Sequence, residues 1–407
     1  MVALLPLSAN HTMKHPPLVN MLRELIALPS ISATSEKWDM GNQAVIEQLA
    51  NWLRPLGFEV RVMPLATPGK ANLIASYGSG SGGLVLAGHS DTVPYDDARW
   101  QSDPFALSDR DNRFYGLGTA DMKGFFALVI EAVSSLLSHD FKAPLIILAT
   151  ADEESSMDGA RALVQSDISG ARYAVVGEPT GLKPIRAHKG ILMEGITITG
   201  RSGHSSNPLL GNSALEAMHE VIGELLNLRG ELQEKYHHPG FAVPTPTMNL
   251  GCIHGGDNPN RICGQCELHF DIRAIPGMDT DEVRQRIQQH LSPIAERRKI
   301  NIGLRSLIGG VDAFEQPADS ELVKVAEQLT GQSADVVNFA TEAPFFQQLG
   351  LQTIVMGPGS IDQAHQPDEF IAHDQIQPTV ALIQNLVTRF CLAPPASTEG
   401  RVTPSAE

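Results

Sequence analysis

The sequence has few cysteines and no long hydrophobic segment. Its 407 residues include only four cysteines, too few for a scaffold built on disulfide bonds. No apolar run approaches the roughly 18 residues that a membrane-spanning helix needs. The apolar start, Met1–Leu7, is too short for a signal peptide and lacks its basic flank. We therefore expect a cytoplasmic protein that neither depends on disulfides nor enters a membrane.

Positive charge is scarce as well. The chain has 30 Lys and Arg against 46 Asp and Glu, a formal net charge of −16. Without a basic stripe to neutralise phosphates, nucleic acid is excluded as a partner. What is present is an ordinary globular composition, 42% hydrophobic and 19% charged. The length suggests roughly two to three domains.

Short apolar runs alternate with helical periodicity in the first half of the chain and near its end. This alternation predicts an α/β domain with a mainly parallel sheet. The expected strands cover 58–63, 72–77, 84–87, 144–150, 173–176 and 353–356. The expected helices cover 18–28, 39–53, 123–138, 159–165 and 375–390.

The middle of the chain follows a different order. Strand patterns at 192–199, 247–253, 262–272 and 301–305 enclose helical patterns at 214–228 and 281–297. This β-α-β-β-α-β order is that of a ferredoxin-like α+β domain, which is complete in itself.

We therefore expect a catalytic domain in two parts, 13–185 and 309–392, interrupted by an inserted domain at 186–308. The Pro- and Ser-rich tail, 393–407, is expected to be disordered. Residues 1–12 form a loose extension in this interpretation, and Met13 is an alternative candidate for the first residue.

Potential metal ligands follow the expected strands. His89 comes just after a buried strand, and Asp91 is placed to hold its other ring nitrogen. Asp121 lies in a Gly-rich turn directly before a helix. Each has a structural alternative, because H-x-D is a common pair and Asp is a favoured helix N-cap.

Three consecutive acids, Asp152, Glu153 and Glu154, follow the apolar strand 144–150. Adjacent extended residues point to opposite sides. One carboxylate can therefore bind a metal while its neighbour addresses the attacking water. A solvated acidic loop is the alternative.

Glu178 and His365 follow two further apolar runs, so the candidates share the carboxyl edge of the expected sheet, where open α/β sheets place their sites. Two histidines and three carboxylates suit two metal ions that share one carboxylate, with a remaining glutamate as base. No G-x-S-x-G motif supports a serine hydrolase. The pattern predicts a two-metal hydrolase.

The motifs around these residues resemble the co-catalytic zinc family of aminoacylases, carboxypeptidases and desuccinylases. The matching segments are GHSDTVP (88–94), GLGTADMKG (116–124), ATADEE (149–154), GEPT (177–180), SGHSS (202–206) and AHQPDEF (364–370). Further segments resemble the acetylornithine deacetylase branch: RAHKG (186–190), GGDNPNRICGQCELHFDIR (255–273), NFATEAPF (338–345) and MGPGSIDQAHQPDEF (356–370). The resemblance implies hydrolysis of an N-acyl amino acid, with N2-acetyl-L-ornithine as the expected substrate in a step of arginine biosynthesis.

The resemblance also implies the roles of the metal-site residues. The implied ligands are His89, Asp121 and Glu178 for one zinc and Asp121, Glu154 and His365 for the other. Asp121 would bridge the two ions, and Glu153 would be the general base. Co²⁺ or Mn²⁺ could occupy the same ligands. The Asp121–Met122 peptide bond is expected to be cis.

The inserted domain resembles the family's lid, which also mediates the formation of a homodimer. His204 matches a lid histidine that crosses to the partner's active site and stabilises the oxyanion. Asn260 and Arg273 match lid residues that hold the substrate, and the planar fork of Arg273 suits a carboxylate. For Arg273 the alternative is a structural salt bridge. Glu342 is a hypothetical partner for the cationic side chain of ornithine.

Three alternatives stay open. The first is a sibling hydrolase, either a broader N-acyl-amino-acid deacylase or a desuccinylase or carboxypeptidase. The second is a non-catalytic binding or scaffold dimer, and the third is a metal-buffering protein. The presence of Glu153 beside a full ligand set argues against a non-catalytic relative.

Overall fold

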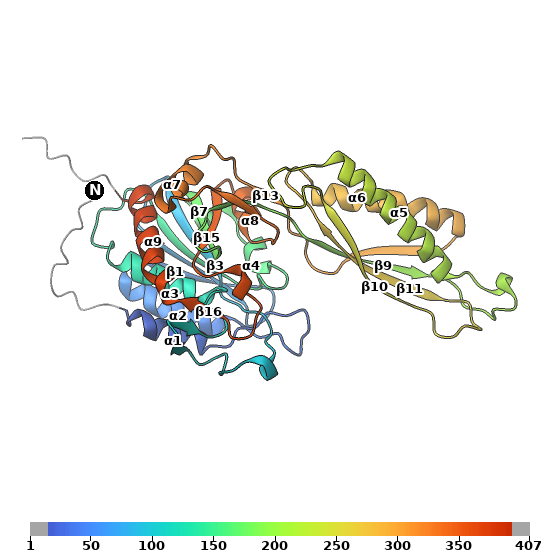
Figure 1. Ribbon diagram of the computed structural model, residues 1–407, viewed down its shortest axis with the longest axis horizontal. Coiled ribbons are helices and arrows are strands. Elements are labelled where there is room, and N and C mark those ends of the chain that lie inside the picture. The colour runs from blue at the N-terminus through green and yellow to red at the C-terminus, as the bar shows by residue number, and fades with distance from the viewer. Residues whose placement is uncertain (1–14, 393–407) are drawn as a thin grey trace, which may run out of the picture.

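The computed structural model describes residues 15–392. The expectations for the N-terminal extension, for Met13 and for the tail 393–407 therefore lie outside the described residues. The described chain forms an elongated molecule with a larger part, built from both ends of the chain, and a smaller part from its middle (Figure 1). None of its described helices is long and apolar enough to cross a bilayer.

The larger part is built around a nine-stranded sheet. Its strands, in spatial order, are β1 (Glu59–Pro64), β2 (Ala71–Tyr77), β6 (Leu145–Thr150), β3 (Gly83–His89), β7 (Ala171–Pro179), β15 (Gln352–Gly357), β8 (Ile185–His188) and β13 (Phe314–Glu315), with β14 (Asp335–Val337) paired to β8. The four central strands, β6, β3, β7 and β15, are parallel, and the pairings on either side of them are antiparallel apart from β14 with β8. This confirms the expected α/β class.

Strand β3 shows why the central strands read as unbroken apolar runs. All seven of its residues are buried. Leu84 and Leu86 pack into the core on one face of the sheet, and Val85 and Ala87 pack into the core on the other. A strand covered on both faces needs apolar side chains at every position instead of at alternate ones.

Helices cover both faces of this sheet. The core on one face is formed with α1 (Leu18–Ile26), α2 (Gln43–Leu53), α3 (Lys123–Ser134), α7 (Glu321–Thr330) and α9 (Ile376–Phe390). The opposite face is covered by α8 (Ala343–Gln348) and the segment 163–168, which follows the short α4 (Asp158–Arg161). Six 3₁₀ turns complete the described helices: η1 (Arg54–Leu56), η2 (Asp97–Arg99), η3 (Gln165–Ile168), η4 (Pro208–Leu210), η5 (Ile361–Gln363) and η6 (His373–Gln375).

The smaller part is a four-stranded antiparallel sheet with two helices on one face. Its spatial order is β10 (Thr247–Gly255), β11 (Gln265–Arg273), β9 (Leu192–Thr199) and β12 (Asn301–Ser306), with α5 (Ala214–Lys235) and α6 (Thr280–Arg298). The expected β-α-β-β-α-β order is confirmed. Along β11 every second residue, from Cys266 to Ile272, is buried in the core of this part.

A third, three-stranded sheet joins distant parts of the chain. It pairs β16 (Phe370–Ala372) with β5 (Arg113–Tyr115), and β5 with β4 (Ser108–Arg110). The pairing places the segment after His365 beside the segment that leads to Asp121.

Candidate metal centre

The four central strands deliver polar side chains to one edge of the large sheet. His89 is the last residue of β3, and Glu178 is the last but one of β7. Glu153 and Glu154 follow β6, and His365 follows β15. Because the strands are parallel, their carboxyl ends meet at this edge.

Asp121 reaches the same edge from the turn before α3. The Asp121–Met122 peptide bond is cis, as expected. Two glycines allow this turn and helix to lie close to the strands. A Cβ atom at Gly88 would lie 2.3 Å from Met122 Cε, and one at Gly177 would lie 2.6 Å from the ring of Phe125.

One cluster of potential ligands combines His89, Asp121 and Glu178. His89 Nε2 lies 3.0 Å from Asp121 Oδ1 and 3.7 Å from Glu178 Oε1. All three side chains are buried, and each offers one ligand atom within 4.8 Å of the other two. This spacing fits a single metal ion.

A second cluster combines Asp121, Glu154 and His365. His365 Nε2 lies 3.0 Å from Glu154 Oε2 and 3.7 Å from Asp121 Oδ2. Asp121 thus turns one carboxylate oxygen toward each cluster, which is the arrangement of a carboxylate shared by two ions. A third group within the same spacing contains His89, Glu153 and Glu154.

The hydrogen bond on the far side of His89 tests whether these residues fit a metal. Its Nδ1 lies 3.0 Å from the backbone carbonyl of Asp91, which only accepts, so Nδ1 carries the proton. In the neutral ring Nε2 then directs a lone pair at the carboxylates of Asp121 and Glu178. Only a cation or a second ring proton makes this contact favourable, so the donor set fits a divalent metal.

Glu178 gives the same indication. Its Oε1 is buried without a hydrogen-bond partner in the part of the chain that the structure describes. An unpaired buried carboxylate is costly. A metal ion at this position would satisfy it.

Burial and neighbouring charges shift the pKa values of the site's acids in different directions. Burial raises the pKa of Glu153 and Glu178 well above the usual range, and neighbouring carboxylates add to the effect. Burial would also raise the pKa of Asp121, but the hydrogen bond and the charge of His89 outweigh it and lower that pKa. The hydrogen bond to Glu154 raises the pKa of His365 to about 9.

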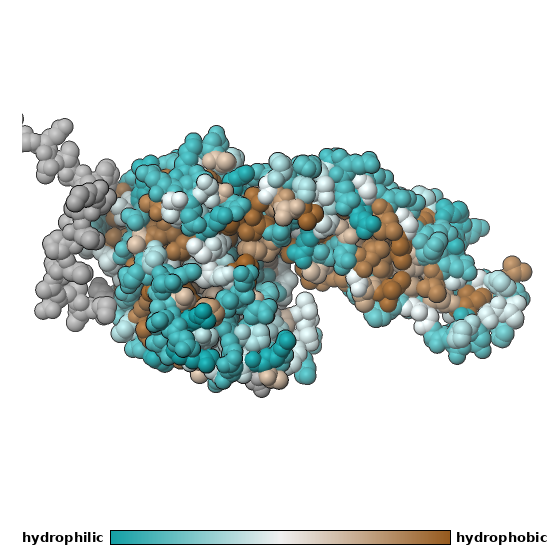
Figure 2. Space-filling view, viewed as in Figure 1, coloured by the Kyte–Doolittle hydropathy of each residue, from teal (hydrophilic) through white to brown (hydrophobic). Residues whose placement is uncertain are grey.

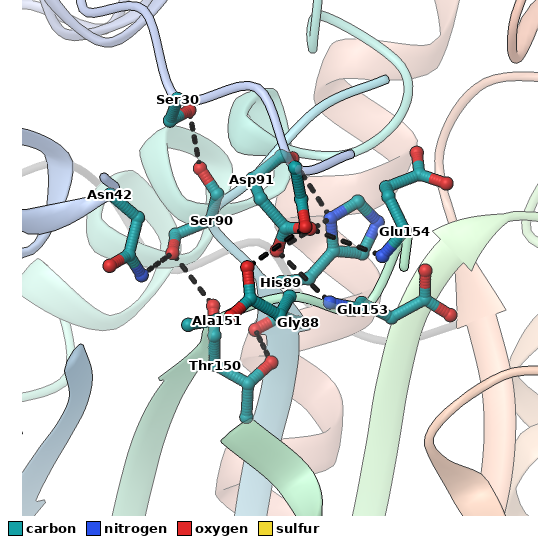
Figure 3. A network of polar contacts seen from close by, with 12 residues as sticks. Ser30, Asn42, Gly88, His89, Ser90, Asp91, Thr150, Ala151, Glu153 and Glu154 are labelled. Carbon is teal, nitrogen blue, oxygen red and sulfur yellow. Dashed lines mark hydrogen bonds and ion pairs between the residues drawn. The ribbon is translucent and has the colours of Figure 1, made fainter. Parts of the chain in front are cut away.

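Asp91 lies beside His89, as expected, but its carboxylate does more than face the ring. Its Oδ1 is 3.7 Å from His89 Nδ1, while its backbone carbonyl makes the shorter contact. The carboxylate accepts backbone N–H groups from Glu153 at 3.3 Å and from Glu154 at 3.1 Å (Figure 3). Asp91 thus connects the histidine to the acidic turn, and burial raises its pKa to about 6.

Glu342 precedes α8 and is completely buried. Neither of its carboxylate oxygens has a hydrogen-bond partner among the described residues. Its charge contributes to the raised pKa of both Glu153 and Glu178, so it lies within electrostatic reach of the clusters. Burial raises the pKa of Glu342 itself to about 7.

The remaining candidates lie in the smaller part, outside the two clusters. Arg273 ends β11, and its Nε donates to Asp271 at 3.0 Å, so the ion pair considered as an alternative is present. His204 is exposed, with Nδ1 2.7 Å from the Ser206 hydroxyl. Asn260 is exposed too.

These three residues lie at opposite ends of the smaller sheet, His204 and Asn260 at one end and Arg273 at the other. β9 leaves the large sheet after β8, and the loop at its far end carries His204. The loop after β10 carries Asn260 and joins the His204 loop through a bridge between His204 and Arg261. β11 runs back in the opposite direction, so Arg273 lies at the end nearest the large sheet.

Two buried residues of this region were not expected from the sequence. Glu369 accepts N–H groups from Gly118 at 3.0 Å, Ala120 at 2.7 Å and Asp121 at 2.9 Å. Lys70 forms ion pairs with Asp152 and Asp39. A signal existed for Glu369, an acid in the motif that carries His365, whereas a single lysine before an apolar strand gives none.

Comparisons with known proteins point to one family. The model of the Peptidase family M20/M25/M40 matches residues 85–389. The acetylornithine deacetylase of Edwardsiella ictaluri (strain 93-146) is 51% identical over 377 residues, 92% of this chain and 98% of that protein. The acetylornithine deacetylase of Klebsiella pneumoniae (strain 342) is 52% identical over 377 residues, again 92% of this chain and 98% of that protein.

Solved structures share the fold at lower identity. The M20 family metallo-carboxypeptidase Sso-CP2 from Sulfolobus solfataricus has a TM-score of 0.69 at 18% identity, covering 92% of this chain and 99% of that one. The YXEP protein of Bacillus subtilis, described as a dinuclear metal binding peptidase from the M20 family, has a TM-score of 0.62 at 14% identity, covering 91% and 97%.

Proposed function

The chain belongs to the Peptidase family M20/M25/M40, and from this premise we propose that it hydrolyses N2-acetyl-L-ornithine to L-ornithine and acetate, a step of arginine biosynthesis. The observation that carries the proposal is the position of Asp121 between two ligand clusters, with Glu153 beside them. The names of the similar curated proteins supply the substrate.

Each cluster would hold one divalent metal ion. His89, Asp121 and Glu178 hold the first, and the second is held by Asp121, Glu154 and His365. Two such ions, when bound, supply Lewis acidity for an attacking water and for the carbonyl oxygen of the substrate. Zn²⁺ suits this set of nitrogen and oxygen donors, and Co²⁺ or Mn²⁺ are substitutes.

Glu153 is the proposed general base. It follows Asp152 in the acidic turn and lies in the group with His89 and Glu154, yet it belongs to neither of the clusters around Asp121. It is therefore free to take a proton from the attacking water and deliver it to the leaving amine. Asp91 orients both the ring of His89 and the backbone of Glu153.

The substrate would be held from three sides. The unpaired carboxylate of Glu342 suits the side-chain ammonium of ornithine. Arg273 suits the α-carboxylate. Asn260 and His204 share the far end of the lid, so both would come from a partner subunit, where Asn260 suits a polar group of the substrate and His204 suits the developing oxyanion.

We propose that the smaller part, 186–308, is a lid and dimerisation domain between the two catalytic segments, 13–185 and 309–392. Hydrophobic residues gather on its surface over α5 and β10 (Figure 2). Leu215 and Leu226 of α5 and Ile253 of the edge strand β10 are 50%, 38% and 48% exposed. An edge strand has one side without a neighbouring strand, and exposed apolar side chains beside it form a surface that a second copy can cover. We place this homodimer in the cytoplasm.

The proposal is tested by acetate release from N2-acetyl-L-ornithine, with N-acetylmethionine and N-succinyl-diaminopimelate as competing candidates. Each assay is run before and after chelation, and again with zinc restored. Preferred, chelator-sensitive turnover of acetylornithine supports the proposal. Preference for another substrate moves the specificity to a sibling hydrolase, and inactivity with two metals bound favours a binding or scaffold dimer.

A further inference from the structure

Lys70 is a buried lysine outside the ligand clusters. It stands just before β2 and is 4% exposed. Its Nζ lies 2.6 Å from Asp152 Oδ1 and 2.8 Å from Asp39 Oδ1. Burial alone would lower the pKa of Lys70, but the hydrogen bonds to these two acids outweigh it and raise that pKa. A buried lysine is rarely found without such partners.

Asp152 begins the acidic turn. Its backbone has a left-handed φ of 61°, and its carbonyl accepts the N–H groups of Ser156 at 3.0 Å and Met157 at 2.6 Å. Its carboxylate also accepts the Ser32 hydroxyl at 2.8 Å. The side chain of Asp152 therefore anchors a tight turn from which the next two residues, Glu153 and Glu154, point to the metal centre.

Two sets of contacts hold this turn, one at its backbone and one at the side chain of its first residue. Asp91 accepts the backbone N–H groups of Glu153 and Glu154 (Figure 3). Lys70 fixes the side chain of the preceding Asp152. Through Asp39 it also ties the turn to the loop 31–40, where Asp39 accepts the N–H of residue 33 at 3.1 Å.

We propose that Lys70 is a positioning residue for the acidic turn, acting through Asp152 to hold Glu153 and Glu154 at the metal centre. The inference rests on the proposed roles of these two glutamates. Lys70 itself touches neither a proposed ligand nor the base. Loss of Lys70 would lower the reaction rate, because misplacement of a reacting group by about 1 Å costs on the order of 100-fold in rate.

The test compares Lys70→Met with Lys235→Met. Lys235 pairs with Glu282 at 3.2 Å on the surface of the smaller part, so its substitution is the matched control. The readouts are kcat and KM, the melting temperature, and the visible spectrum and dissociation constant of bound Co²⁺. We expect Lys70→Met to lower kcat at least ten-fold with KM within two-fold, and to alter the Co²⁺ spectrum, while Lys235→Met matches the unmodified protein.

A milder variant keeps the inference testable if Lys70→Met does not fold. Ser32→Ala removes the other side-chain contact of Asp152, and we expect a two- to five-fold fall in kcat with KM unchanged. A lowered melting temperature with kcat and the Co²⁺ spectrum unchanged in both variants would overturn the proposal. If the unmodified protein does not hydrolyse acetylornithine, the Co²⁺ spectra and affinities still decide the role of Lys70, and only the proposed function fails.

Discussion

At the residue scale, Glu342 differs from the other acids of the site. It is completely buried, neither of its carboxylate oxygens has a hydrogen-bond partner among the described residues, and it belongs to none of the three groups of potential ligands. We predict that Glu342→Gln lowers kcat/KM for acetylornithine by about ten-fold or more, as expected for the loss of a charged hydrogen bond. N-acetylmethionine has no cationic side chain, so its turnover should change much less. Steady-state kinetics on both substrates provide the measurement, and equal losses would remove Glu342 from substrate recognition.

His188 is a second residue whose surroundings define its chemistry. Its buried ring has Nδ1 2.9 Å from the backbone carbonyl of Lys189, so Nδ1 donates. Nε2 must then accept from the N–H and the hydroxyl of Thr341, the residue before Glu342. A proton on Nε2 would oppose the Thr341 N–H, and burial lowers the pKa of His188 to about 4.

The lowered pKa of His188 predicts how stability changes with pH. The unfolded chain takes up this proton near pH 6.5 and the folded protein only near pH 4, so stability falls as pH drops through this window. The full effect is on the order of 3 kcal/mol. Urea unfolding at several pH values should show a shallower loss for His188→Gln than for the unmodified protein. Identical pH slopes would contradict the prediction.

At the scale of elements, the sequence reveals strands that are covered on both faces and polar residues that follow them. The runs at 84–87, 145–149 and 354–356 are apolar throughout, and each is followed by a member of the ligand clusters. Helical periodicity also located α3, α6 and α9, although their ends differ by a few residues. These features are local in sequence and depend on burial alone.

Features that depend on distant contacts were missed. The short strands β8, β13 and β14 and the three-stranded sheet have too few residues to show periodicity. The expected strand at 262–272 begins only at Gln265, because residues 262–264 make loop contacts with the turn around Gly203 and with Gly200 and Ala214. Lys70 gains its partner Asp152 from 82 positions away. No pattern in one sequence reports such a pairing.

Glu369 shows how two elements are joined at the site. Its carboxylate accepts three N–H groups of the turn 118–121, and its own backbone carbonyl accepts the N–H of Gly116 at 3.0 Å. Since His365 lies four residues before it, Glu369 fixes the distance between the loop of His365 and the turn of Asp121. Both residues belong to the second ligand cluster.

We predict that Glu369→Gln weakens the binding of the metal ion in the second cluster by 10- to 100-fold, the usual cost of losing a partner that orients a ligand. The NH₂ group of the glutamine would face a backbone N–H of the turn 118–121. Because both groups are donors, they would repel each other and move the loop of His365 away from this turn. Calorimetric titration of the metal-free protein with Zn²⁺ gives the measurement. Glu282→Gln, on the surface of α6, is the control and should leave both sites unchanged. A change below two-fold in Glu369→Gln would show that the contact does not shape the centre.

At the scale of the whole molecule, the two ends of the lid have different tasks in our proposal. β9 has eight residues and leads away from the large sheet, so the His204 loop lies about 25 Å beyond the start of that strand. Arg273, at the returning end of β11, stays close to the large sheet. This geometry favours action of Arg273 in its own subunit and of His204 in a partner.

Mixing two inactive variants tests this division. In a dimer of one His204→Ala and one Glu153→Ala chain, the site with an intact Glu153 faces the lid with an intact His204. We therefore predict that each variant alone is inactive and that an equilibrated mixture regains about a quarter of the activity, because half of the dimers are mixed and each has one intact site. Native mass spectrometry verifies that mixed dimers form. Mixed dimers without recovered activity would place His204 in its own subunit's site. A His204→Ala chain that is active alone would place it outside the reaction, and the exposed end of the lid would then serve association alone.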